Sequence, residues 1–442
     1  MTQRLATPEK LRTLQRKLYA KAKTDPAFRF YSLHDKIWRS DVLAHAFALA
    51  KANGGAPGVD GESFAAIEAS GVETWLAGLA QELKDGTYRP QPVRRVTIPK
   101  PDGGERPLGI PTIRDRVAQT AAKLILEPIL EADFEPNAYG YRPGRSALDA
   151  VREVHRLLLA GHTDVVDADL SQYFDEIPHR DLLRSVAQRV ADRNVLRLIK
   201  LWLKAPVAEQ DERGHWVMTG GKRRSKGTPQ GGVLSPVLAN LYMNRFLKYW
   251  RRNGHRDQLQ AHVVAYADDL VILTRGHAAE AMARLRSAMP RLGLTVNETK
   301  TATVDARSQQ FDFLGYSLGA HYRRWNGKWY LGASPSKKSV QRLKANVRAL
   351  LVPSNSGNWL ETRDRLNRML RGWAGYFCYG SRGVAYRAVD AHVAQRTRHF
   401  LRRRHQVASR ATRQFGDHRL FGELGVLSVQ ALSRAARSNA ST

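Results

Sequence analysis

Cysteine is almost absent from this chain, because Cys378 is the only one among 442 residues. A single cysteine cannot form an intramolecular disulfide, and it excludes a zinc site that needs several cysteines. Long apolar runs are also missing: the stretch Leu124-Ile125-Leu126 is broken by Glu127-Pro128, and no segment approaches membrane-spanning length. We therefore expect no membrane partner, and we expect Cys378 to be a small core residue.

Acidic residues are scarce relative to basic ones. Lys and Arg number 71 against 41 Asp and Glu, which gives a net charge of +30 and an isoelectric point near 10.5. An excess of this size would repel itself without a polyanionic partner, so nucleic acid is the expected partner, and charge that only aids solubility is the alternative. The first ten residues lack the apolar core of a secretory signal, which predicts a cytoplasmic location.

The apolar content of 43 % is sufficient for packed cores, and the length is typical of two to three domains. Apolar residues at helical spacing over 35–53 predict a helix that ends before Gly54-Gly55. Strand-like alternation over 94–110 surrounds a turn at 101–104 and predicts a hairpin. Mixed helical and strand patterns then continue to about Leu331.

The remainder of the chain is almost wholly helical in pattern. Ser334 is expected to cap a helix, and Pro335 is expected to lie in its first turn. Two further helical patterns, over 359–373 and 384–401, carry many arginines and few acids. Such a pattern favours a phosphate-binding face over a merely solvated one.

Two adjacent acids, Asp268 and Asp269, lie between the apolar runs 263–265 and 270–273, which predicts a hairpin with both carboxylates at its tip. Neighbouring carboxylates repel one another unless a cation or solvent separates them, and such hard oxygen ligands suit Mg²⁺. Taken alone, the pair is better explained as a solvated turn between two core strands.

Two other segments complete the pattern. The apolar strand over 165–170 carries Asp167 and Asp169 on one face, because side chains alternate along a strand. The glycine-bearing loop 226–236 includes Pro229-Gln230-Gly231 and leads into a helical pattern, so its backbone can approach a ligand closely.

A strand with Asp, a Pro-Gln-Gly loop and a Tyr-Ala-Asp-Asp hairpin, in this order, resemble the palm of a reverse transcriptase. The fuller resemblance, from about residue 18 to residue 427, is to the reverse transcriptase/maturase of bacterial group II introns. The motifs that carry it are Gly55-Ala56-Pro57-Gly58-Val59-Asp60-Gly61, Ile98-Pro99-Lys100, Arg106-Pro107-Leu108-Gly109-Ile110-Pro111, Tyr139-Gly140-Tyr141-Arg142-Pro143, Gly293-Leu294 with Asn297 and Lys300, Phe313-Leu314-Gly315 and Arg371-Gly372-Trp373-Ala374-Gly375-Tyr376-Phe377.

This resemblance implies an α+β fold: a right-hand polymerase, with fingers and a palm that contains an antiparallel sheet, followed by an all-helical thumb or maturase domain. The expected division is an N-terminal helical extension with an RNA-binding loop (1–80), fingers and palm (81–332), the helical domain (333–427) and a polar tail (428–442). Full-length mobile members often end in a nuclease with paired cysteines. A chain with one cysteine is therefore expected to be of the type that lacks an endonuclease.

The resemblance also implies the chemistry. Asp169, Asp268 and Asp269 would be the catalytic ligands of two Mg²⁺ ions, with Mn²⁺ as a substitute, in RNA-directed DNA synthesis by in-line phosphoryl transfer. Asp167 is expected to have a structural role. In the family, an aromatic residue follows the metal ligand by five positions, and Phe174 lies five positions after Asp169, not after Asp167.

Five residues are expected to contact the incoming deoxynucleotide. Lys100 and Arg106 would bind the triphosphate, Gln230 would lie against nucleotide and template, and Phe174 would exclude a 2′-hydroxyl. Lys300 would protonate the pyrophosphate leaving group. Core packing is the alternative for Phe174, and an ordinary surface lysine is the alternative for Lys300. Asp175 and His179 are expected to be structural, with His179 satisfied by local hydrogen bonds.

The expected partners are an RNA template, intron RNA, a DNA or RNA primer and deoxynucleotides, with a homodimer left open. RNA contacts are predicted at Arg142, Arg145, Arg371, Arg402 and Arg403. Two other functions stay open: a domesticated reverse transcriptase in phage defence or CRISPR spacer acquisition, and a mainly noncatalytic splicing maturase. The presence of all three acids argues against the last.

Overall fold

The computed structural model describes residues 5–99, 104–211, 213–323, 325–407 and 414–438; the side chains of Arg106, Lys222 and residues 434–438 also lie outside this description. Five helices open the chain: α1 (Glu9–Thr24), α2 (His34–Ile37), α3 (Ser40–Asn53), α4 (Phe64–Ser70) and α5 (Val72–Asp85). The single helix predicted over 35–53 is wrong in one respect, because the chain leaves the helix at Trp38-Arg39 between α2 and α3. Gly54 follows α3 at φ +63°, a conformation that glycine adopts readily.

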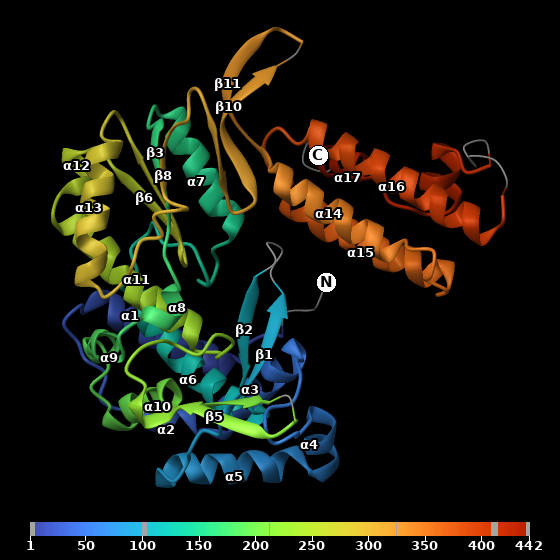
Figure 1. Ribbon diagram of the computed structural model, residues 1–442. Helices are drawn as coiled ribbons and strands as arrows, with labels where there is room; N and C mark the ends of the chain where they lie inside the picture. Colours follow the sequence, from blue (N-terminus) through green and yellow to red (C-terminus); the bar gives the residue numbers. More distant parts are fainter. Residues whose placement is uncertain (1–4, 100–103, 212, 324, 408–413, 439–442) are drawn as a thin grey trace.

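Three sheets form the framework (Figure 1). The first has the order β2 (Glu105–Ile110), β1 (Val93–Pro99), β4 (Pro206–Gln210), β5 (Trp216–Gly220). The second has the order β6 (His262–Tyr266), β7 (Asp269–Thr274), β3 (Asp164–Asp169), β8 (Ala302–Asp305), with every neighbouring pair antiparallel. The third has the order β11 (Lys328–Pro335), β10 (Tyr316–Arg323), β9 (Gln310–Phe313).

The second sheet is apolar on both faces, which explains the continuous apolar runs of its strands. Val165 and Val271 face a core shared with α7 (Ala147–Leu159). Val166 and Ile272 face the main core, to which α11 (Ser235–Arg252) and α13 (Ala278–Arg291) contribute. Because side chains alternate along a strand, the register is strongly specified, since a slip of one residue would exchange the two faces.

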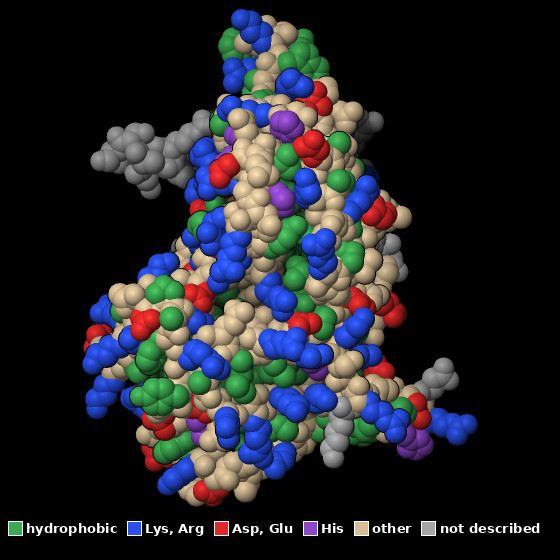
Figure 2. Space-filling view, turned by 90° about the vertical axis from the view of Figure 1, so that its left-hand side faces the viewer, with side chains coloured by type: hydrophobic (Ala, Val, Ile, Leu, Met, Phe, Trp, Pro, Cys, Tyr) green, Lys and Arg blue, Asp and Glu red, His purple; other side chains and the backbone are tan. Residues whose placement is uncertain are grey.

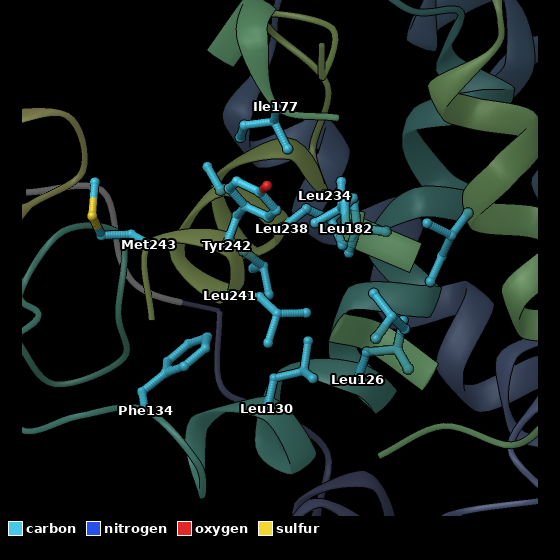
Figure 3. Close-up of a cluster of buried hydrophobic side chains, with 14 of the residues drawn as sticks. Leu126, Leu130, Phe134, Ile177, Leu182, Leu234, Leu238, Leu241, Tyr242 and Met243 are labelled. Atoms are coloured by element: carbon cyan, nitrogen blue, oxygen red, sulfur yellow. The ribbon is translucent and has the colours of Figure 1, made fainter. Parts of the chain in front are cut away.

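The main core continues into α6 (Ile113–Glu131), which is buried along most of its length. Figure 3 shows leucines of α6 approaching leucines of α11, beside side chains such as Leu182 of α9 (His179–Ala187). The remaining helices before the third sheet are α8 (Tyr173–Glu176), α10 (Arg193–Leu203), α12 (His255–Gln258) and a 3₁₀ turn at Gly221–Arg223. None of the helices in the described ranges combines the length and apolar composition needed to cross a membrane.

The C-terminal part is helical and has its own core (Figure 1). It consists of α14 (Lys337–Leu350), α15 (Trp359–Tyr376), α16 (Gly383–Arg404), a π-helical turn (Arg419–Glu423) and α17 (Val429–Ser438). The predicted cap is wrong: Ser334 and Pro335 are the last residues of β11, and Ser336 caps α14 by accepting a hydrogen bond from Ser339 N. The core prediction for Cys378 is also wrong, because this residue is exposed just beyond the end of α15.

Candidate active site

Asp169, Asp268 and Asp269 lie at one end of the second sheet, at or next to the ends of β3, β6 and β7. The register pairs Tyr266 with Asp269 across β6 and β7, and it pairs Asp169 with Asp269 across β3 and β7. Asp268 occupies the tight turn between β6 and β7, next to Ala267 at φ +57°. The predicted hairpin is therefore confirmed, and carboxylates separated by about a hundred residues in sequence lie on adjacent strands.

The loop after Phe134 supports this turn from beneath. Tyr139 N donates to Ala265 O at 2.8 Å, and Ala265 N donates to Asn137 O at 3.0 Å, so the loop pairs with the end of β6. A Cβ atom on Gly140 would lie 2.6 Å from Ala267 N, so only glycine permits this approach of the two backbones.

Each of these carboxylates makes the ionisation of its neighbours less favourable. Burial, then repulsion from Asp268 and Asp169, raises the pKa of Asp269 to about 6, while the Lys300 ammonium acts in the opposite direction. Burial, then repulsion from Asp269, raises the pKa of Asp167 to about 7. Asp269 is exposed, but other carboxylates lie near its own carboxylate. Such a group of oxygens has the chemistry of a site for hard divalent cations.

The segment after α13 orients Asp169. Asn297 Nδ2 donates to Asp169 Oδ2 at 3.0 Å, and Asn297 N donates to Asp169 O at 2.8 Å. Lys300 Nζ lies 3.6 Å from Asp169 Oδ2, and the Lys300 side chain is 64 % exposed. Sequence reasoning placed Asn297 only in a motif, because a contact across 128 residues has no local signal.

The Pro-Gln-Gly loop lies against β2 and α8. Gly109 N donates to Gln230 O at 2.6 Å, and a Cβ on Gly231, which has φ +102°, would collide with Gly109 O. Gln230 Nε2 donates to Asp175 Oδ2 at 2.8 Å. Thr228 N donates to Phe174 O at 2.7 Å, which brings the partly buried Phe174 beside the loop.

His179 is buried, and its Nε2 lies 2.7 Å from Gly227 O. Burial lowers the pKa of His179, which favours the neutral ring. This confirms the expected local hydrogen bond for one ring nitrogen, although Nδ1 has no protein partner. Across the described residues, Asp169, Asp268 and Asp269 included, no group of three or more His, Cys, Asp or Glu side chains is arranged so that it could hold a metal ion.

Comparisons with known proteins agree with this geometry. The model of the reverse transcriptase (RNA-dependent DNA polymerase) family matches residues 98–318, which is half of the chain. This chain belongs to the reverse transcriptase family. The model of the group II intron maturase-specific domain matches residues 340–416 of this reverse transcriptase. The chain is thus an RNA-directed DNA polymerase with a maturase domain, in the α+β fold that was predicted.

Several relatives are similar to this reverse transcriptase. Protein YkfC of Escherichia coli is 34 % identical over 377 residues, which cover 76 % of this chain and 96 % of YkfC. Group II intron-encoded protein LtrA of Lactococcus lactis is 39 % identical over 178 residues, which cover 40 % of this chain and only 28 % of LtrA. A telomerase from Candida albicans, solved with a telomeric RNA fragment, gives a TM-score of 0.43 at 13 % identity and covers 81 % of this chain and 70 % of that one.

Two residues of the reverse transcriptase are candidates for binding the triphosphate. The predicted β1–β2 hairpin is confirmed, with Ile98 paired to Arg106. Lys100 lies outside the described residues, and so does the side chain of Arg106. Their contacts with a nucleotide therefore stay predictions.

One predicted RNA contact needs correction. The guanidinium of Arg142 is buried, donates to both Glu131 oxygens, and donates to the carbonyls of Glu135 and Ala138 at 2.7 and 2.8 Å. These bonds fix the loop beneath the catalytic turn and leave Arg142 unavailable to RNA. Arg145, three residues on, is only partly exposed: its guanidinium lies over the ring of Tyr139, and its Nη1 donates to Pro136 O at 2.5 Å.

The arginines predicted to bind RNA in the helical domain lie at its surface. Arg371 is exposed on α15. Arg402 and Arg403 border a surface hollow of about 440 Å³, together with Arg396 and His399. This concentration of cations around one hollow suits an anionic backbone.

Hydrogen bonds from the hydroxyl groups of two tyrosines join the helical domain to the region of the turn between β9 and β10. Tyr316 Oη donates to Tyr376 O at 2.7 Å, and Tyr376 Oη donates to Leu314 O at 2.7 Å. Ser339 Oγ of α14 donates to Gly315 O at 2.9 Å. Because the side chains of Tyr266 and Tyr376 pack against one buried cluster, the β6–β7 hairpin and the helical domain are connected through it.

Proposed function

We propose that this reverse transcriptase copies an RNA template into DNA at Asp169, Asp268 and Asp269 by two-metal phosphoryl transfer, and that it binds intron RNA to assist splicing and mobility. The observation that carries the site assignment is the register of β3, β7 and β6, which brings the three carboxylates to one end of the sheet. The maturase domain supports the second part.

Divalent ions suit this site, since reverse transcriptases use them and the donors here are carboxylates that repel one another, as the raised pKa of Asp269 indicates. Asp169, Asp268 and Asp269 would hold Mg²⁺, or Mn²⁺ in its place. When bound, such ions activate the primer 3′-hydroxyl and neutralise the triphosphate and departing pyrophosphate. The chain itself fixes the carboxylate of Asp169 through Asn297.

The neighbouring side chains would handle the nucleotide. The position of Lys300, 3.6 Å from Asp169, supports a role in protonating the pyrophosphate. Gln230, held on β2 by its own carbonyl, would contact nucleotide and template, and Phe174 would exclude the 2′-hydroxyl. Lys100 and Arg106 would bind the triphosphate, because cations offset the charge that develops on phosphate oxygens.

The proposed division places fingers and palm in residues 81–332, between the N-terminal helical extension (1–80) and the maturase domain (333–427), with a tail at 428–442. The separate core of the helical domain supports this division. Strand β11 runs to Pro335, so the boundary is better placed at Ser336.

The direct test is extension of a labelled DNA or RNA primer on an RNA template with deoxynucleotides and Mg²⁺. We expect template-dependent DNA that is abolished by EDTA and restored by excess Mg²⁺. Unchanged synthesis in EDTA, or extension without a template, would contradict the proposal. Splicing is tested separately, by incubating the chain with the intron RNA from its own locus.

Phe174→Ala is expected to lower the preference for deoxynucleotides over ribonucleotides by roughly tenfold or more, because steric exclusion of the 2′-hydroxyl is lost. The measurement is kcat/KM for dCTP and CTP in single-nucleotide extension. Phe174→Tyr is the control, since it keeps the bulk of the ring and should keep the preference. An unchanged ratio in Phe174→Ala, together with lower stability, would assign Phe174 to core packing alone.

RNA binding is expected to weaken steeply with salt, because each neutralised phosphate of a single strand contributes a slope of about 0.7 in log K against log [salt]. Replacing Arg371 and Arg403 by alanine should reduce the slope by about 1.4. Arg184→Ala is the matched control, because Arg184 is exposed but already paired with Asp181. A wild-type affinity that does not change with salt would refute the interpretation of the net charge of +30.

A further inference from the structure

The hairpin of β10 and β11 carries an aromatic tip that no step of the proposed polymerase reaction uses. Tyr322, Trp325 and Trp329 are 52 %, 82 % and 67 % exposed. At the base of the same hairpin, Tyr316, Leu318 and Ala333 are buried. Large aromatic side chains gain free energy from burial, so three of them exposed together at one tip indicate a partner.

The aromatic side chains are ordered relative to one another. Tyr322 and Trp329 are paired across the strands, so they share one face of the hairpin, with ring centroids 5.3 Å apart. Trp325 lies in the connecting turn. On the other face, the guanidinium of Arg323 lies 4.3 Å from the ring centre of Tyr330.

The hairpin is braced by the helical domain. Ser381 N donates to Ala333 O at 2.7 Å, and the hydroxyls of Tyr330 and Ser381 lie 2.7 Å apart. The tip projects beyond these contacts at the top of the molecule (Figure 1). The rings are therefore held in place before a partner binds, so less conformational entropy is lost on binding.

The charges of the residues near the tip indicate which class of partner it binds. No Asp or Glu occurs between Asp312 and Glu361, and the two strands carry Arg323 and Lys328 at the tip. Figure 2 shows hydrophobic and basic side chains gathered at the projecting upper end of the molecule. Exposed aromatic rings can stack on unpaired bases, since every base offers a π-face, and the neighbouring cations can bind the phosphate backbone.

We propose that Tyr322, Trp325 and Trp329 form a stacking platform for unpaired bases of bound RNA, with Arg323 and Lys328 near its phosphates. This inference rests on the proposed function in taking RNA as the partner. The eight residues of β10 span roughly 27 Å, so the platform lies well away from the turn at Leu314-Gly315 that contacts the catalytic region. It adds affinity for RNA outside the active site and takes no part in nucleotide addition.

The test compares the wild type with Trp325→Ala/Trp329→Ala by fluorescence anisotropy, using a labelled 20-nucleotide oligo(U) RNA and a blunt RNA duplex. We expect the double variant to bind oligo(U) about tenfold or more weakly and the duplex within about twofold of wild type. Trp325→Phe/Trp329→Phe keeps the rings and should restore binding. Tyr31→Ala, which removes an equally exposed ring at 74 % exposure, is the matched control and should have no effect.

Three outcomes would overturn the platform: unchanged oligo(U) affinity in the alanine variant, an equal loss on the duplex, or loss only of binding to phosphatidylglycerol vesicles, which would indicate a membrane surface. Primer extension on a short template keeps the two proposals distinguishable. The alanine variant should retain wild-type kcat there, and Asp268→Ala should retain wild-type oligo(U) binding. Loss of oligo(U) affinity without any polymerase activity in the wild type would refute only the proposed function.

Discussion

Asp268→Ala is expected to lower the rate of RNA-templated DNA synthesis by about a thousandfold or more, while RNA affinity changes little. Asp268 lies in the turn next to Asp269, and its removal would take away one of three carboxylates available to the divalent ions. Loss of a group that stabilises charge in the transition state has effects of at least this order. Single-turnover primer extension measures the rate, and filter binding measures the RNA affinity.

Two controls separate this effect from misfolding. Asp268→Asn keeps the size of the side chain and should be nearly as inactive, because a neutral amide is a poor ligand for Mg²⁺. Asp364→Ala removes an exposed carboxylate on α15 that pairs with its neighbour Arg363, and it should keep full activity. Synthesis by Asp268→Ala at the wild-type rate would refute the site assignment.

Arg142→Met is expected to lower the free energy of unfolding by about 3–5 kcal/mol, because it leaves a partly buried Glu131 carboxylate without its partner. The carbonyls of Glu135 and Ala138 also lose their donor. Urea denaturation followed by tryptophan fluorescence measures the loss, and the transition that includes the palm should move to lower urea concentration.

Arg145→Met is the matched control in the same loop. Arg145 is only partly buried and donates to Pro136 O instead of to a buried acid, so its removal should lower stability much less, by about 1 kcal/mol, and should weaken RNA binding instead. If Arg142→Met kept full stability and weakened RNA binding, the original prediction of an RNA contact at Arg142 would be restored.

Arg142 and Arg145 show what sequence can and cannot predict in this chain. Both follow an aromatic motif in one short loop, and nothing local distinguishes them. The difference arises because Glu131, at the end of α6, reaches only the first of them. Hairpins were predictable because their apolar alternation and turn residues are local, as at β1–β2 and β6–β7.

Long-range packing explains the other misses. Cys378 is exposed because the chain turns away after Phe377 enters the core. The general preference of cysteine for burial contains no information about that turn. Ser334 has the chemistry of a helix cap, but pairing with Ser317 keeps it in β11. Asn297 and Tyr376 reach the site from distant segments, and only the folded chain brings them there.

The paired hydrogen bonds of Tyr316 and Tyr376 have a consequence for how this protein can change in evolution. A maturase domain cut at Lys337 would expose Tyr376 and Phe377, which now lie against the β9–β10 turn. Exchange of that domain between relatives would therefore have to carry a compatible Leu314-Gly315 turn with it. The two parts are inherited most safely as a unit, even though each has a core of its own.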